Sequence, residues 1–217
     1  MRGAFAHEDF STGEEIAHSV THGLGALGAT VSIVLLVLRA VPTGDARTVV
    51  AVSIYGASML MLYTASTLYH ALTAQRAKRV FQLMDHGAIY LLIAGSYTPF
   101  TLVALGGSWG WSLFGVTWGL AILGILYEVV LKRPWKRVSL MFYLIMGWMA
   151  VIAARPLAAA LPHDGLLLLG VGGLFYSGGA VFYAWRAFPY HHAVWHLCVM
   201  AGSASHFLCI LWYVIPA

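Results

Sequence analysis

Long apolar runs, separated by short polar or turn-forming segments, fill almost the whole chain. A helix needs about 20 mostly apolar residues to cross the hydrocarbon core of a bilayer. The pattern therefore predicts seven spanning helices, at residues 17–40, 48–72, 80–104, 109–131, 138–158, 165–186 and 190–214. It shows no alternation of apolar and polar positions of the kind that builds a transmembrane barrel. The expected fold class is an all-α membrane protein, a seven-transmembrane-helix bundle that forms one domain over residues 1–217.

Composition supports this reading, because 60% of the residues are hydrophobic and only 9% are charged. An ordinary soluble domain carries about 25% charged residues. The segment before the first apolar run contains Glu8, Asp9, Glu14 and Glu15 and lacks the short apolar core of a signal peptide. We therefore expect the first apolar run to be an uncleaved span. The net charge of +4 comes from short loops, so we expect membrane lipids and no nucleic acid as partners.

The Lys and Arg residues are divided unequally between the two sides of this topology. Loops on the cytoplasmic side of a membrane carry the excess of these residues. The side with the N-terminus holds nine of the 12: Arg2, Arg76, Lys78, Arg79, Lys132, Arg133, Lys136, Arg137 and Arg186. The other side holds the remaining three: Arg39, Arg47 and Arg155. The sequence thus predicts a multi-pass protein of the cell inner (plasma) membrane, with a cytoplasmic N-terminus and the C-terminus outside.

Histidines gather at the predicted cytoplasmic ends of several spans. Eight of the ten fall there, all but His163 and His206. His192 and His196 stand four residues apart, so their side chains share one helix face. His70 ends the second predicted span at a matching depth. Ionisable groups inside a membrane are costly and usually mark function.

Three imidazoles on one ion leave a fourth position open on a tetrahedral zinc, as in catalytic sites. His70, His192 and His196 are therefore the predicted metal ligands. Imidazole also suits copper, nickel and iron, and zinc is the ion we expect. Asp85 is either a further ligand or a base that acts on a bound water. Ser66 lies one turn deeper than His70, where its hydroxyl can orient that water or donate to a developing oxyanion.

Other interpretations of these histidines remain open. A histidine near a membrane interface can simply face headgroups or bond to backbone carbonyls. His18 and His22 form a rival pair four residues apart, less favoured because Asp85 and Ser66 then have no evident role. His206 is ten residues beyond His196, roughly 15 Å deeper, and is expected to be a buried, hydrogen-bonded histidine.

Several motifs together resemble the haemolysin III family, the bacterial branch of the progestin and adipoQ receptor superfamily, which includes the adiponectin receptors. They are Ser66-Thr-Leu-Tyr-His70, Met84-Asp85-His86-Gly87-Ala88-Ile89-Tyr90, Ile93-Ala94-Gly95-Ser96-Tyr97-Thr98-Pro99-Phe100 and His192-Ala-Val-Trp-His196. Glu15-Ile16 followed by Thr21-His22-Gly23 is similar to the family's opening motif. The resemblance covers nearly the whole chain.

The resemblance implies zinc ligands at His70, His192 and His196, with the family's aspartate and serine at Asp85 and Ser66. It also implies a cytoplasmic N-terminus. The long N-terminal cytoplasmic domain of the animal receptors has no counterpart here, so signalling through such a domain is not implied.

Three functions follow as hypotheses. The first is a zinc-dependent hydrolase of lipid amides, similar to the ceramidase-like activity of the adiponectin receptors. The second is a non-enzymatic membrane-homeostasis or lipid-sensing protein in which zinc is structural. The third, a cytolytic pore-former, has little support, because the sequence shows no secretion signal and no amphipathic segment suited to late insertion. The sequence gives no indication of the oligomeric state or of the lipid substrate.

Overall fold

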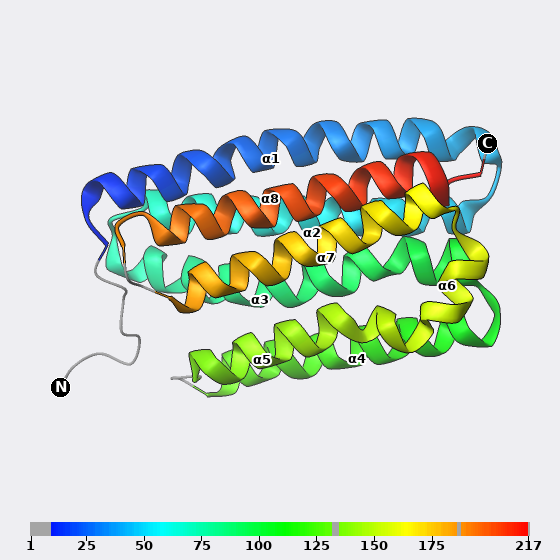
Figure 1. Cartoon of the computed structure of the whole chain (residues 1–217). Helices are drawn as coiled ribbons and strands as arrows, with labels where there is room; N and C mark the ends of the chain where they lie inside the picture. Colours follow the sequence, from blue (N-terminus) through cyan, green and yellow to red (C-terminus); the bar gives the residue numbers. More distant parts are fainter. Residues whose placement is uncertain (1–9, 132–134, 186–187, 217) are drawn as a thin grey trace.

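A computed structural model describes residues 10–131, 135–185 and 188–216, and most of these residues are helical (Figure 1). Its α-helices are α1 (Thr12–Ala40), α2 (Ala46–Ala71), α3 (Gln75–Pro99), α4 (Gly107–Val130), α5 (Lys136–Gly147), α6 (Ala154–Ala160), α7 (His163–Ala184) and α8 (His191–Cys209). Short helical segments of other pitch are η1 (Val41–Thr43), η2 (Phe100–Leu105), η3 (Trp148–Ala153) and η4 (Ile210–Val214). Together these elements make seven helical stretches, within the described residues, that are long and apolar enough to span a membrane, as the sequence predicted.

Capping groups set the beginnings of the first two spans. The Ser11 hydroxyl accepts a hydrogen bond from the Glu14 backbone amide, and the Glu14 carboxylate accepts one from the Ser11 amide. This capping box satisfies backbone donors that the first turn of a helix leaves free. Asp45 caps α2 through its carboxylate, which accepts hydrogen bonds from the Arg47 and Thr48 backbone amides. Hydrogen bonds from the Thr48 hydroxyl and the Arg47 amide hold the pKa of the Asp45 carboxyl below its usual range.

The fifth span differs from the single regular helix expected over 138–158. It runs through α5, then the 3₁₀ segment η3, then α6. The Tyr97 hydroxyl of α3 donates to the Gly147 carbonyl and accepts from the Ala150 amide at 2.8 Å each. Irregular backbone at membrane depth requires partners inside the protein, and Tyr97 supplies them at this break.

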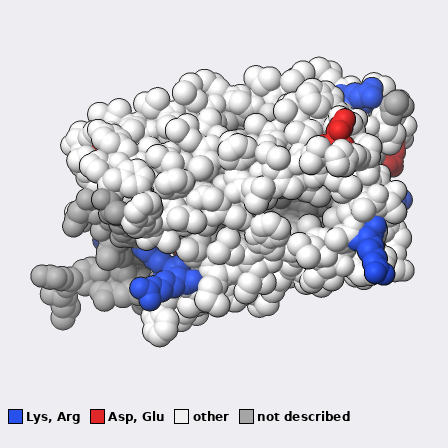
Figure 2. Space-filling model, viewed as in Figure 1, with Lys and Arg blue, Asp and Glu red and all other residues white. Residues whose placement is uncertain are grey.

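The span that begins with α3 is the most buried of the seven. In the most apolar window of α3, 67% of the residues are buried, against 22% for the corresponding window of α1. Close approach depends on small residues, as is usual between helices in membranes. A Cβ atom placed on Gly124 of α4 would lie 2.2 Å from the Tyr90 ring of α3. The Lys, Arg, Asp and Glu residues visible in Figure 2 lie toward the two ends of the bundle, and the surface between them on this face is uncharged.

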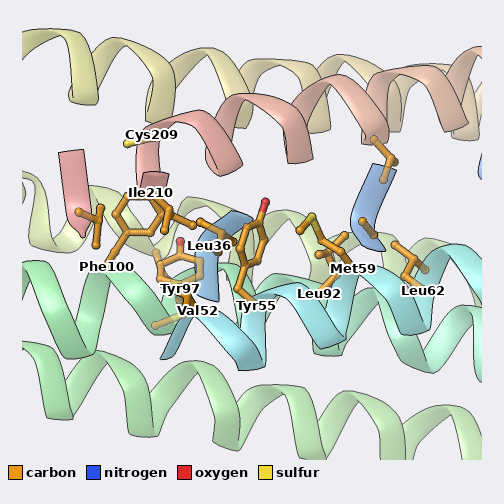
Figure 3. Close-up of a cluster of buried hydrophobic side chains, with 14 of the residues drawn as sticks. Leu36, Val52, Tyr55, Met59, Leu62, Leu92, Tyr97, Phe100, Cys209 and Ile210 are labelled. Carbon is orange, nitrogen blue, oxygen red and sulfur yellow. The ribbon is translucent and has the colours of Figure 1, made fainter. Parts of the chain in front are cut away.

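Buried side chains fill the bundle between α1, α2, α3 and α8 along its length (Figure 3). A polar node ties α2 to α7 and α8 within this core. The Tyr63 hydroxyl donates to Ser203 Oγ at 2.7 Å, and the Tyr176 hydroxyl lies 2.8 Å from the same oxygen. The Tyr55 hydroxyl donates to the Ser203 carbonyl at 2.8 Å. This node holds α8 in register against α2, and the register decides where the histidines of the two helices meet.

Candidate metal centre

Three histidines from two helices meet at the end of the bundle where α1 begins, on the left in Figure 1. His70 lies in the last turn of α2, and His192 and His196 lie one turn apart at the start of α8. Each offers one ring nitrogen, and the three nitrogens lie within 4.8 Å of one another. The residues are 3%, 8% and 1% exposed. A tetrahedral zinc sets its ligand nitrogens about 3.3 Å apart, so a small inward movement would allow all three to bind one ion.

Glu15 of α1 fixes the orientation of the His70 ring. His70 Nδ1 donates to Glu15 Oε2 at 2.6 Å, and Lys78 Nζ donates to Glu15 Oε1 at 2.6 Å. A carboxylate on one ring nitrogen places the proton there and leaves the other nitrogen free to bind a metal. His70 Nε2 is buried and has no hydrogen-bond partner among the described residues. The Glu15–His70 pair thus has the form of a carboxylate-supported metal ligand.

A second contact from α1 orients His196. The Thr21 hydroxyl lies 2.9 Å from the His18 carbonyl and 2.8 Å from the Ala17 carbonyl, so its proton is engaged there. Its oxygen accepts from His196 Nδ1 at 3.1 Å, and the His18 carbonyl also lies 3.2 Å from this nitrogen. The proton of His196 therefore sits on Nδ1, which leaves Nε2 as the nitrogen with a free lone pair. Helix α1 positions two of the three histidines.

The rival pair on α1 lies inside the same cluster. The His18 ring centroid is 4.8 Å from those of His70 and His192, and His18 is completely buried. His22 stacks on His196, with ring centroids 3.5 Å apart and an interplanar angle of 8°. Glu15, His18 and His70 form a second group whose ligand atoms lie within 4.8 Å of one another. From the sequence, His18 and His22 were an alternative ligand pair to the histidines of α2 and α8. In the structure, the histidines of all three helices lie in one cluster.

Asp85 and Ser66 face a cavity of about 400 Å³ that also reaches His192 and His196. The Ser66 hydroxyl lies beside the Asp85 carboxyl, and His70 and His86 are neighbours of that carboxyl. The hydroxyl makes no hydrogen bond of ordinary geometry with any described residue. Asp85 belongs to neither group of mutually close ligand atoms found in the described chain. Its place is at the cavity wall beside the cluster.

The cavity continues from the histidines toward the opposite end of the bundle. Its walls are mostly apolar side chains of α3, α5, α7 and α8. His206 lies on this wall, with Nε2 3.3 Å from the Leu169 carbonyl and its ring against Tyr176. His206 is therefore the buried, hydrogen-bonded histidine that the sequence predicted, away from the histidine cluster. Such an elongated apolar space beside a polar group suits an acyl chain.

Glu128 of α4 makes a separate polar contact at the same end of the bundle. Its carboxylate accepts a hydrogen bond from the Ser139 hydroxyl and lies 3.8 Å from His86 Nδ1. From its position near the end of its helix, Glu128 would be expected to pair with the loop cations Lys132 or Arg133, and these two residues lie outside the described ones.

Sequence reasoning missed the supporting role of α1. Glu15, His18 and His22 stand at i, i+3 and i+7, a spacing that puts them on one face of a helix. This polar stripe on an otherwise apolar span was the sequence signal for a functional role of α1. The partner of the stripe could not be predicted from spacing, because Glu15 and His70 are 55 residues apart in the chain.

Comparison with known proteins bears on the whole assembly. A family model described as "Haemolysin-III related" matches residues 10–207. The chain belongs to the haemolysin III family. It is 45% identical over 203 residues to Hemolysin-3 of Bacillus cereus, which covers 94% of this chain and 93% of that protein. It is 43% identical over 206 residues to a Hemolysin-3 homolog of Bacillus subtilis, covering 95% of this chain and 97% of the relative.

More distant similarity extends to animals. The human monocyte to macrophage differentiation factor is 30% identical over 167 residues, which is 74% of this chain and 69% of the human protein. This relative supports the link between haemolysin III proteins and the progestin and adipoQ receptor superfamily. The seven apolar helices and the family together make this haemolysin III chain a multi-pass membrane protein.

Proposed function

We propose that this haemolysin III protein is a zinc-dependent hydrolase of lipid amides, of ceramidase-like specificity. The observation that carries the proposal is the convergence of three buried ring nitrogens from His70, His192 and His196 beside a cavity lined by Asp85 and Ser66. The donor set fits zinc, because the unpartnered Nε2 of His70 is buried and carboxylate-supported, as metal-binding imidazoles usually are. A bound Zn²⁺ supplies Lewis acidity and makes a water nucleophilic near neutral pH.

The chain's own residues perform the remaining work of hydrolysis. The Asp85 carboxylate accepts the proton of the attacking water and returns a proton to the amine that leaves. The Ser66 hydroxyl, free of other partners among the described residues, donates a hydrogen bond to the developing oxyanion. Glu15 and Thr21 are positioning residues that hold the His70 and His196 rings in place.

The apolar cavity is the proposed binding space for the acyl chain. It runs along α3, α5, α7 and α8, so an acyl chain lying in it would present its amide carbonyl to the histidine end. We further propose that this end faces the cytoplasm in the inner membrane. Of the described Lys and Arg residues, Arg76, Lys78, Arg79, Lys136 and Arg137 belong to this end, and basic residues favour the cytoplasmic side.

The metal part of the proposal is tested by mass spectrometry of metal content on purified protein. Wild type is expected to carry one zinc per chain, and the His70→Ala, His192→Ala and His196→Ala variants to lose it. His206→Ala, which removes a buried histidine outside the cluster, is the matched control and keeps the metal. Zinc retained in all three cluster variants would refute the site.

The chemistry is tested by measuring fatty acid release from ceramides and other acyl amides by zinc-loaded protein in lipid nanodiscs. Asp85→Asn is expected to lower turnover by roughly 100-fold or more while zinc content is unchanged, because proton transfer contributes about 10²–10⁴-fold. Asp164→Asn, the same change at the opposite end of the bundle, leaves turnover unaltered. If zinc-loaded wild type releases no fatty acid from any acyl amide, the hydrolase proposal fails.

A second function, membrane homeostasis or lipid sensing with a structural zinc, is favoured by one observation. The ring nitrogens come from α2 and α8, and α1 supports them, so an ion there would join three helices. This function requires metal-dependent stability but no turnover. Loss of thermal stability on zinc removal in a protein that hydrolyses no acyl amide would support it over the hydrolase.

A further inference from the structure

His18 occupies the centre of the histidine cluster. Its ring centroid lies 4.8 Å from those of His70 and His192 and 5.5 Å from that of His196. No other histidine outside the proposed ligand set approaches all three rings within the described chain. The residue is completely buried.

Neither ring nitrogen of His18 has a hydrogen-bond partner in the described part of the molecule. A buried polar group without a partner is costly, and native proteins rarely tolerate it without an ion or water nearby. The Phe10 ring packs against the His18 ring in an edge-to-face arrangement, with centroids 4.6 Å apart. The unsatisfied nitrogens are therefore in a pocket walled by the three proposed ligands and an aromatic ring.

Glu15 does not fill this need, because both of its carboxylate oxygens are already engaged. Oε2 accepts from His70 Nδ1 and Oε1 accepts from the Lys78 ammonium, each at 2.6 Å. The ammonium also argues against a second, separate cation bound by Glu15, His18 and His70, since it would repel a dication at that carboxylate. The ion proposed for its three neighbours would satisfy His18 directly.

We propose that His18 is a fourth nitrogen ligand of that ion in the resting protein. This inference rests on the proposed metal site and concerns how access of water to that site is regulated. Four imidazoles complete the tetrahedral shell of zinc, and a closed shell leaves no position for water. Hydrolysis then requires His18 to leave the ion, so helix α1 controls whether the centre is open. His18 shares a group with His70, with ligand atoms within 4.8 Å, but lies outside the group of His70, His192 and His196, so its ring must move inward to bind the same ion.

The test replaces zinc with cobalt(II), whose visible absorption reports coordination, and adds azide as a small probe anion. Wild type is expected to show a four-coordinate spectrum that azide does not change. His18→Ala opens a position, so azide shifts its spectrum, and chelator competition shows zinc bound at least about tenfold more weakly. His18→Gln, which keeps a bulky polar side chain, is expected to behave in the same way. His206→Ala is the matched control and resembles wild type in both measurements.

Two results would overturn the inference. Azide that shifts the wild-type spectrum means that the fourth position is already open, and this measurement on wild type decides even if neither variant folds. Zinc affinity in both His18 variants within twofold of wild type means that His18 is no ligand. A wild type that binds no stoichiometric metal refutes the proposed metal site itself and removes the basis of this inference with it.

Discussion

Replacing Glu15 by Gln is the sharpest test of the role assigned to α1. The substitution keeps the size of the side chain but removes the charge from the hydrogen bond to His70 Nδ1, whose length is 2.6 Å. Hydrogen bonds to an ionised acceptor are roughly twice as strong as neutral ones. Loss of such support behind a metal-binding histidine typically lowers metal affinity by roughly 10–100-fold. This corresponds to about 1.4 to 2.7 kcal/mol of binding free energy.

The Lys78 ion pair must be separated from this effect, because Glu15→Gln breaks it as well. The paired side chains of Lys78 and Glu15 are 16% and 20% exposed, whereas the His70 side chain is 0% exposed. Partly exposed ion pairs contribute about 0–1 kcal/mol. Lys78→Met, which leaves the carboxylate on His70, is therefore expected to weaken zinc binding by about fivefold at most.

The assay is competition between the purified protein and a chelator of known zinc affinity, in detergent of constant composition. Wild type, Glu15→Gln and Lys78→Met are titrated side by side. If Glu15→Gln binds zinc within twofold of wild type, or if Lys78→Met falls as far as Glu15→Gln, the proposed support of His70 is wrong.

Three further outcomes follow from the fold and the site. Gly124→Ala places a Cβ atom 2.2 Å from the Tyr90 ring, so thermal unfolding should show a free energy of unfolding lower by about 1–3 kcal/mol. The control Gly119→Ala, with no described atom within 4 Å, should leave that free energy unchanged, and equal effects of the two variants would refute the close packing. Ser203→Ala leaves two buried tyrosine hydroxyls without their shared partner and should cost about 1–3 kcal/mol in the same assay, and an unchanged melting temperature would contradict this. Adding a strong chelator should lower the melting temperature of wild type but not that of His192→Ala, because only the folded wild-type site binds the ion; an equal response would argue against the site.

The number of spans was predictable from hydropathy, because the bilayer sets a length that each apolar run must meet. The residues at which the spans begin and end were less predictable. The third span begins at Gln75 rather than at residue 80, since polar residues continue the helix beyond the apolar run. The change of pitch after Gly147 depends on the Tyr97 hydroxyl, which reaches it from another helix. Nothing local in residues 138–158 encodes that contact.

The same distinction applies to the candidate site. The i, i+4 spacing placed His192 and His196 on one face, and the predicted depth placed His70 near them. The position of His18 among these rings, and the bond between Glu15 and His70, arise only when α1 packs against α2 and α8. Spacing along one helix carries no information about which neighbour its polar stripe will meet.

The length of the first span has a consequence for the conditions under which the centre works. Thr12–Thr43 comprises 32 helical residues, or about 48 Å. The hydrocarbon core is about 30 Å thick, so this span must tilt or extend into the headgroup layer. Its first turns hold Glu15, whose other oxygen meets a partly exposed ammonium. Dissolved salt and the charge of lipid headgroups screen interactions at that depth. Ionic strength and lipid composition are therefore expected to affect the histidines through Lys78 and Glu15, although the rings themselves are buried.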